Sequence, residues 1–389
     1  MSARRACGRL QSNVSVVRMN VLVFFASSWY FALVDTGVTA VTMHVHSEPS
    51  SIESEWSALA DRVGTVFSSR PSFVVNVARA LKLDFELVAI RRDGRLVASA
   101  ALSLVRRGPF TLAKVIGTGL GVPIEFLSED PEASDALLDA IASLGYMVDA
   151  DSMITNDPTV CRLAQHPSWT VDMMVRERVP VIDLAVGQRA SDIRSAKSLK
   201  RLRQYRSEVQ RRSSFRVEEI TEVSHLDARW NDILEVAVRG IAGTTKINYL
   251  TAPHGDFARD FLRSEARAGR LCIAGLVIDG QWAAHEIGLR TGSRMEGWLT
   301  HYDPTVGRCQ PGHQLIEWFT NNHDELGVDA LDQGVGVNEI KSAWATSDYE
   351  LVRVSAVPTA WVMSGVLVRL LRQLPPALSR IRRYVQRFP

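Results

Sequence analysis

The segment from Trp282 to Trp344 reads WAAHEIGLRTGSRMEGWLTHYDPTVGRCQPGHQLIEWFTNNHDELGVDALDQGVGVNEIKSAW, and its pattern decides the fold that we expect. It predicts two strands, the second ending at Tyr302, then a loop, a helix over His313–Leu326, a short strand over Val328–Leu331 and a last helix. A glycine that adopts a positive φ is expected to end the long helix at Gly327. Strands and helices in this order indicate an α/β domain.

The same order of elements occurs earlier in the chain. The apolar runs FELVAI and LVASAALSLV flank Asp93-Gly94, and LCIAGLVI and QWAAHEIGLR flank Asp279-Gly280; apolar runs around Asp-Gly predict β-hairpins. The two turns lie 186 residues apart, and the two glycines expected to end a helix, Gly145 and Gly327, lie 182 apart. Both signals are common, so coincidence is the alternative, but the near-equal offsets favour an internal duplication.

Size and charge bound the function. The chain has 389 residues, with 46% hydrophobic and 23% charged residues and a formal net charge of +2, which is typical of a soluble globular protein with two domains or more. The stretch from Arg194 to Arg212 alone carries +7, and its Ser195–Arg211 part predicts a helix with one apolar side. Any anion-binding role is therefore local. This stretch has a single aromatic residue, Tyr205, and no known motif, which argues against nucleic-acid binding.

Both ends of the chain combine apolar and basic residues. Val21–Val34 is shorter than the roughly 20 residues that span a bilayer and resembles the apolar core of a signal peptide. We expect translation to start at Met43 and residues 1–42 to pack little against the domains; a signal or anchor, or an ordered extra element, are the alternatives. The tail Leu351–Pro389 has seven arginines and no acidic residue. Its predicted helix, Trp361–Leu374, either packs on the domain or rests on a membrane surface.

Two features of the first-quoted segment have the chemistry to bind a ligand. The predicted helix opens with Gln310-Pro311-Gly312-His313, and the unpaired N–H groups at a helix start favour phosphate, although this signal alone is weak. Asp332 follows the short strand, where α/β folds place ligands, and Lys341 is far enough along to fold back toward it. An Asp332–Lys341 ion pair that only fixes a loop is the alternative. The four cysteines show no metal-ligand or redox-pair spacing.

These motifs resemble those of GNAT-type acetyltransferases related to the CelD cellulose-biosynthesis protein. The resemblance covers about Trp56 to Val357 and also includes the basic stretch SLKRLRQYRSEVQRR. The matching positions are Gly297-Trp298, Tyr302-Asp303, Pro311-Gly312, Asp332 with Gly334 and Gly336, and Lys341 with Trp344. It implies an α/β (α+β) fold of two GNAT-like domains, each a mixed, mostly antiparallel sheet flanked by helices.

The chain departs from the family at two places. The usual phosphate loop, Arg/Gln-x-x-Gly-x-Gly/Ala, is reduced to Arg308, Gln310 and Gly312, and Ile340 stands where a tyrosine often precedes the lysine. Both departures bear on the affinity for acetyl-CoA and on substrate contacts.

The resemblance implies direct acyl transfer from acetyl-CoA or another acyl-CoA, with no metal. Its catalytic candidates are His285, because a histidine with an unshifted pKa can act near pH 7, Tyr302 as the acid for the thiolate, Asp332 and Lys341. Glu286, Glu296 and Asp303 are further carboxylates on or beside these strands. The proposed pyrophosphate contacts are the Gly312–Gln314 turn, and the proposed pantetheine contacts are Trp298–Tyr302 and Val328–Leu331. The cofactor candidates are Trp298, Leu299, Arg308, Gly312, His313 and Gln314. For His285 and Tyr302 the alternative is a residue that only packs in the core.

The function that follows is N- or O-acyl transfer to a sugar, envelope precursor or small metabolite. A Fem-like aminoacyl transferase and a non-enzymatic accessory protein of polysaccharide or envelope assembly are the alternatives. We expect a cytoplasmic protein, with peripheral membrane contact through its basic segments and no nucleic-acid partner. The expected units are an extension over 1–42, a diverged GNAT-like domain over 43–180, a linker with the basic helix over 181–216, the acyltransferase domain over 217–357 and a basic tail over 358–389.

Overall fold

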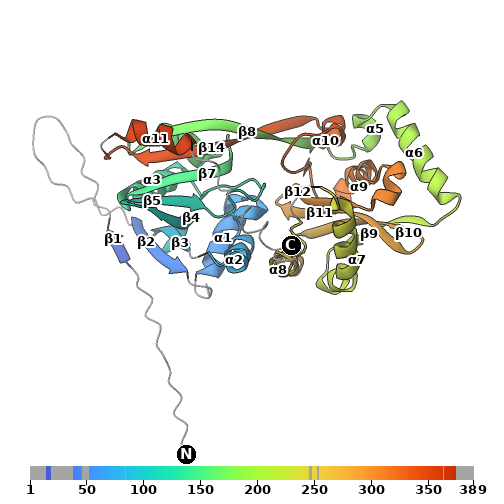
Figure 1. The fold of residues 1–389 in the computed structure, drawn as a ribbon, viewed down its shortest axis with the longest axis horizontal. Coiled ribbons are helices and arrows are strands. Elements are labelled where there is room, and N and C mark those ends of the chain that lie inside the picture. Colours follow the sequence, from blue (N-terminus) through green and yellow to red (C-terminus); the bar gives the residue numbers. More distant parts are fainter. Residues whose placement is uncertain are drawn as a thin grey trace, which may run out of the picture.

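The computed structural model describes residues 15–18, 38–45, 52–83, 85–244, 248–251, 254–361 and 363–373. They form an elongated α/β molecule in which one mostly antiparallel sheet runs from end to end (Figure 1). The strand order is β1-β2-β3-β4-β5-β7-β14-β8-β13-β12-β11-β10-β9, with β6 paired to β4 at the side. This architecture confirms the predicted fold class.

The first half of the chain builds one end of this sheet. Its elements are β1 (Ser15–Arg18), β2 (Val38–Val45), α1 (Glu53–Val63), η1 (Phe67–Ser69), α2 (Pro71–Ala80), β3 (Phe85–Arg92), β4 (Arg95–Arg107), β5 (Phe110–Val115), β6 (Leu127–Ser128), α3 (Pro131–Ser143), β7 (Tyr146–Ile154), α4 (Pro158–Leu163) and β8 (Trp169–Asp183). Local chemistry sets the start of α3, where Asp130 caps the helix by accepting a hydrogen bond from the N–H of Ala133.

The second half builds the other end. Its elements are α5 (Ala190–Ile193), α6 (Ala196–Gln210), β9 (Phe215–Ile220), α7 (Val223–Ile241), α8 (Gly255–Arg267), β10 (Leu271–Ile278), β11 (Gln281–Thr291), β12 (Arg294–Tyr302), η2 (Pro304–Cys309), α9 (Pro311–Leu326), β13 (Ala330–Asp332), α10 (Glu339–Trp344), β14 (Ser347–Pro358) and α11 (Ser364–Gln373). Gly327 ends α9 at a φ of 64°, and Gly145 follows α3 at a φ of 69°, as the sequence predicts.

The two halves share one connectivity. The series β2-α1-α2-β3-β4-β5-α3-β7-α4-β8 is matched by β9-α7-α8-β10-β11-β12-α9-β13-α10-β14. In each series the second, third and fourth strands form an antiparallel run joined by tight turns. One parallel pair follows, β5 with β7 and β12 with β13. The repeated order is therefore a repeated topology.

The two Asp-Gly turns occupy equivalent hairpins, as predicted. Both have positive φ at each turn residue, 52° and 77° at Asp93-Gly94 and 50° and 76° at Asp279-Gly280, the geometry that a two-residue hairpin of type I′ requires. In both hairpins the register shifts just before the turn, between Ile90 and Arg91 and between Leu276 and Val277. A shared bulge at the same place makes coincidence a poor explanation.

The final strand of each half pairs with the opposite half. β14 pairs with β7 of the first half, β8 pairs with β13 of the second, and β8 and β14 pair with each other from Trp169–Pro358 to Val181–Ser347. This ribbon runs along one long side of the molecule (Figure 1). Removing either half would therefore leave strands of the other without partners.

Two main cores lie on opposite faces of the sheet in the second half of the chain. The larger spans both halves and includes α1, α2, α7 and α8, while the second lies under α6, α9 and α10. Side chains of β10 alternate between them, Ile273 facing the first core and Ala274 the second. In the part of the chain that the structure describes, no helix is both long and apolar enough to cross a membrane.

The expectation that residues 1–42 pack little is wrong for its last part. β2 pairs with β3 along its whole length, from Val38–Arg92 to Val45–Phe85, so a chain that starts at Met43 would lose residues 38–42, most of this eight-residue strand. The apolar run over 21–34 lies outside the described residues. β8 and β9 likewise run across the predicted limits at 180/181 and 216/217. The domain ranges stay a proposal, with β2 counted in the first half.

Candidate active site

The site begins where β12 and β13 part. The two strands pair in parallel at only three positions, the last being Glu296 with Asp332. β12 then continues to Tyr302, and in the described residues no strand pairs with this stretch on the β13 side. The register with β11 shifts between Ile287 and Gly288, which makes Trp298 the extra residue of a bulge. The open strand edge and the bulge leave backbone groups available to a ligand.

The loop after β13 closes the end of this opening that lies next to Asp332. Asp332 accepts hydrogen bonds from the N–H of Gly334 at 2.8 Å and from the hydroxyl of Tyr349 at 2.7 Å. Gly334 has a φ of 74°, and a Cβ there would lie 2.6 Å from the carbonyl oxygen of Gly297, so only glycine fits. Burial raises the pKa of Asp332, while the Tyr349 hydroxyl and the Gly334 amide oppose the shift. Asp332 ends β13 itself, one residue beyond the predicted strand.

Lys341 holds the same loop from α10. Its Nζ donates to the carbonyl oxygens of Gly334 at 2.9 Å and Val335 at 3.0 Å. Its charge also lowers the pKa of both Asp332 and Glu286 against the opposing effect of burial. The structure thus brings Asp332 and Lys341 together as predicted, with the lysine anchored on backbone oxygens.

Glu286 is the carboxylate at the opening on the α9 side. It accepts a hydrogen bond from the Thr300 hydroxyl at 3.0 Å, and a Cβ at Gly297 would lie 2.9 Å from its Oε1. Its side chain is half-buried, and burial raises its pKa. With Gly297 and Asp332 it lines a cavity of about 20 Å³, room for about one water molecule. A substrate therefore has to displace part of the loop.

Glu296 is the carboxylate on the other face of β12, toward the first half. It is 2% exposed, its Oε2 accepts from the N–H of Phe67 at 3.3 Å, and its Oε1 has no hydrogen-bond partner. Burial, followed by the charge of Asp332, raises the pKa of Glu296 to about 8. A carboxyl group that is neutral near pH 7 and has one unpaired oxygen is a second candidate acid or base.

His285 and Tyr302 lie apart from this opening. His285 has no exposed surface; its Nε2 lies 3.1 Å from Nδ1 of His301, and its Nδ1 accepts from Trp282 Nε1 at 3.3 Å. Burial, with the His301 ring adding to it, holds the pKa of His285 well below its usual range. Tyr302 is 43% exposed and follows Glu296 by six residues, about 20 Å along an extended strand.

The prediction that His285 and Tyr302 border one cleft with Asp332 and Lys341 is therefore wrong as geometry. It assumed that β12 and β13 end together, but β13 stops opposite Glu296. The catalytic roles of His285 and Tyr302 stay predictions.

The start of α9 is partly covered by α10. Gln310 adopts a φ of 54° and Pro311 begins the helix, which leaves the N–H groups of Gly312 and His313 at its free end. A Cβ at Gly312 would lie 3.4 Å from Ile340 Cδ1. His313 Nδ1 accepts from Trp344 Nε1 at 2.8 Å, and burial lowers the pKa of His313 with help from the Arg194 charge.

The remaining cofactor candidates differ in how far a ligand could reach them. Arg308 is exposed. Gln314 is buried, and its amide is used by Leu202, Cys309 and Arg206. The Trp298 ring packs in an aromatic cluster, and Leu299 packs on the same core. The cluster partners of Trp298 are Phe67, Phe73, Phe257 and Phe261.

Sequence reasoning did not single out Thr300 or Tyr349 as part of the site. Tyr349 lies in β14, and only its long-range pairing with β8 brings it to Asp332. The sequence offers several carboxylates near these strands, and Glu286 is one of them. Because adjacent side chains of a strand point to opposite faces, Glu286 faces away from the buried His285, and this alternation is the signal that distinguishes it from the other carboxylates. Among the described residues, no group of three or more His, Cys, Asp and Glu side chains is placed to hold a metal ion.

Known proteins share both the local pattern and the whole fold. Residues 196–342 match the family model of the acetyltransferase (GNAT) domain. The chain is similar to FemX, with 11% identity and a TM-score of 0.59 over 85% of this chain and 100% of that one. It is also similar to the C-terminal domain of a protein from Agrobacterium fabrum described as a lysylphosphatidylglycerol synthetase, with 14% identity and a TM-score of 0.54 over 84% of this chain and 95% of that domain. No curated protein sequence matches the chain.

The segment over 196–342, which matches the acetyltransferase (GNAT) model, contains the opening between β12 and β13. At 11% and 14% identity, the two solved structures show a common fold.

Proposed function

We propose that the protein transfers an acyl group from an acyl-CoA to an amine or hydroxyl of a sugar, an envelope precursor or a small metabolite. One observation carries this proposal. Within the segment that matches the acetyltransferase domain, β12 presents an unpaired edge beyond Glu296, with a bulge at Trp298. The amide groups of a pantetheine arm can pair with such an edge in the way an added strand does.

The donor would lie along β12 and reach the start of α9. The N–H groups of Gly312 and His313, with the exposed Arg308, are the proposed contacts of the pyrophosphate. The bulge at Trp298 is the proposed source of an N–H group aimed at the thioester oxygen, where negative charge develops during attack.

Glu286 is the proposed general base. It takes the proton from the acceptor amine or hydroxyl, the acceptor forms a bond to the thioester carbon, and the carbon–sulfur bond breaks to release the thiolate of CoA. Tyr302, which is exposed on the same strand as Thr300, stays the proposed acid for that thiolate. Lys341 and Asp332 position the loop that covers Glu286. The finer relation to CelD-type acetyltransferases also stays a prediction.

Aminoacyl transfer is the second candidate. Ile340 and Trp344 crowd the start of α9, and the phosphate loop is incomplete, so a donor without a CoA pyrophosphate would also suit the site. The similarity of fold to FemX and to the lysylphosphatidylglycerol synthetase domain agrees with this alternative. If neither donor is used, an accessory role in envelope assembly is what remains.

Peripheral membrane contact from the cytoplasmic side is part of the proposal. α11 exposes Val366 and Leu370, with the exposed Met363 just before the helix and the exposed Arg369 beside them, which is the pattern of an interfacial helix. We expect the protein to co-sediment with anionic vesicles and the double variant Val366→Asp/Leu370→Asp to remain in the supernatant.

Thiol release tests the transferase proposal. Wild-type protein with acetyl-CoA and a panel of amino sugars, amino acids and polyamines should release free CoA faster than the same mixture without acceptor. Aminoacyl-tRNA in place of acetyl-CoA tests the second candidate. Absence of transfer with both donors, in folded protein, would leave the accessory role.

A further inference from the structure

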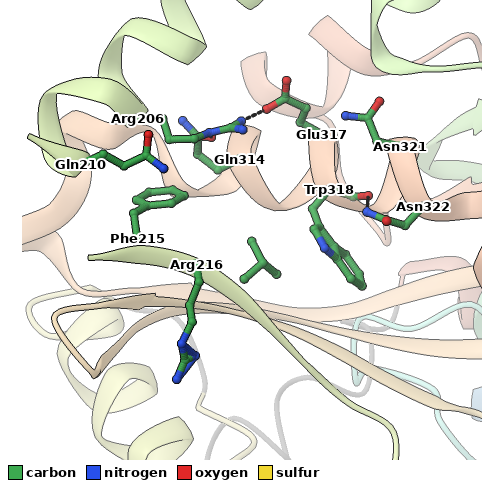
Figure 2. A pocket seen from close by; sticks show the side chains of 10 residues that line it. Arg206, Gln210, Phe215, Arg216, Gln314, Glu317, Trp318, Asn321 and Asn322 are labelled. Carbon is green, nitrogen blue, oxygen red and sulfur yellow. Dashed lines mark hydrogen bonds and ion pairs between the residues drawn. The ribbon is translucent and has the colours of Figure 1, made fainter. Parts of the chain in front are cut away.

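A pocket lies at the free edge of the sheet in the second half, apart from the opening between β12 and β13 (Figure 2). Its volume is about 280 Å³, and α6, the edge strand β9 and one side of α9 form its walls. None of its lining residues takes part in the proposed transfer, except that Gln314 was a cofactor candidate from the sequence.

The floor and one wall of the pocket are apolar. Phe215 of β9 faces α9, whereas the side chain of Arg216 points away (Figure 2). Because side chains alternate along a strand, Val217 lies on the same face as Phe215, and both pack against the second core. Trp318 of α9 is half-buried, and its indole points toward this floor. A ligand with a flat ring would therefore contact an aromatic side chain on one side of the ring.

The charged side chains that face the pocket balance each other. Arg216 points away and is ion-paired with Glu218. Arg206, in contrast, is ion-paired with Glu317 and donates from Nε to Gln314 Oε1 at 2.9 Å. The Arg206 guanidinium also lies 5.9 Å from the centre of the Phe215 ring. Because its charge is already neutralised, the site offers little to a phosphate or a carboxylate.

Polar groups at the rim retain hydrogen-bonding capacity. Asn321 Oδ1 accepts from the N–H of Ala190, and Asn322 Nδ2 donates to the carbonyl of Trp318. Asn321 Nδ2 and Asn322 Oδ1 have no partner among the described residues, and the same holds for the side-chain amide of Gln210 and for Nε1 of Trp318. None of these atoms is among the buried unpaired groups, so they reach the solvent in or beside the pocket.

We propose that this pocket binds a single neutral sugar ring. The C–H face of a pyranose would lie on the Trp318 indole, and its hydroxyls would meet the free donors and acceptors of Gln210, Asn321 and Asn322. The volume lies just below the range of about 300–1,000 Å³ that holds drug-sized ligands, which suits one ring and excludes a nucleotide. A nucleobase stacked on the same indole is the competing occupant.

Saturation-transfer NMR on the full chain tests the proposal, with glucose and N-acetylglucosamine as probes and uridine and adenosine as competitors. Transfer to the sugar ring protons is expected at millimolar concentration. Trp318→Ala should weaken sugar binding at least tenfold, while Trp318→Phe keeps most of it. Gln210→Ala, an exposed position, should weaken it about fivefold, and Gln204→Ala, exposed on the same helix outside the pocket, should leave it unchanged.

Three results would overturn the proposal. The first is no transfer to either sugar in folded wild-type protein, and the second is sugar binding that is unaffected by both Trp318→Ala and Gln210→Ala. The third is Trp318-dependent binding of the nucleosides alone, which would make the pocket a base-stacking site. Because Gln210 is exposed, its variant remains informative even if Trp318→Ala does not fold.

Discussion

Glu296 of the second half accepts a hydrogen bond from the backbone N–H of Phe67 in the first half, 229 positions away in the chain, at 3.3 Å. A buried ion pair, Arg70 with Glu265 at 2.9 Å, crosses the same interface. The two halves therefore share buried polar contacts as well as one sheet, and the first half completes the surroundings of β12.

Stability should fall as the pH rises because of Glu296. Its folded-state pKa of about 8 lies above the ordinary value of a glutamate, so the folded protein holds a proton that the unfolded chain has lost between about pH 4.5 and 8. The free energy of unfolding should decrease through this window by up to about 1.4 kcal/mol per pH unit. Urea unfolding at several pH values measures this slope.

Glu296→Gln should flatten that slope, because the amide cannot titrate. Some dependence should remain up to about pH 7, since burial also raises the pKa of Asp157 to about 7. An equal slope in the wild type and in Glu296→Gln would show that Glu296 does not hold the proton.

Replacing Glu286 should separate catalysis from folding. Glu286→Gln keeps the hydrogen bond from Thr300 but cannot accept the acceptor's proton, so turnover should fall about 100-fold with an unchanged melting temperature. Because the base must be ionised and its pKa is raised, wild-type activity should increase with pH through that pKa, and the variant should lack this limb. Glu325→Gln, an exposed position on α9, is the matched control.

Lys341→Met should lower stability as well as turnover. The variant loses two hydrogen bonds from a charged group to the loop carbonyls, which should cost about 1–3 kcal/mol of unfolding free energy. Lys200→Met on the exposed side of α6 is the control. Unchanged stability with lost turnover would instead assign Lys341 to the substrate.

Local pattern predicted much of this fold from the sequence. Helices such as α3, α8 and α9, and the hairpins around Asp93-Gly94 and Asp279-Gly280, follow from periodicity, caps and turn residues within a few positions of each other. The pairing of β14 with β7 and β8 joins residues more than 160 positions apart, and no local signal specifies it. β2 was missed because its strand follows a segment that reads as a targeting sequence.

The site was predicted less completely, because it too depends on strand pairing that no local sequence signal specifies. The closeness of Asp332 and Lys341 follows from their spacing, and in the structure both side chains bind the backbone of Gly334. The length of β13 decides which residues of β12 share that opening, and the sequence does not fix where a short strand stops. Tyr349 reaches Asp332 only through the exchange of the final strands.

Titration calorimetry of acetyl-CoA into the folded full chain tests the central claim most directly. We predict one binding site per chain with a dissociation constant in the micromolar range. Arg308→Glu, at the proposed pyrophosphate contact, should weaken binding at least fivefold, and Lys200→Glu should not change it. No binding of acetyl-CoA or CoA at millimolar concentration, in protein that is folded, would contradict the acyl-CoA transferase account.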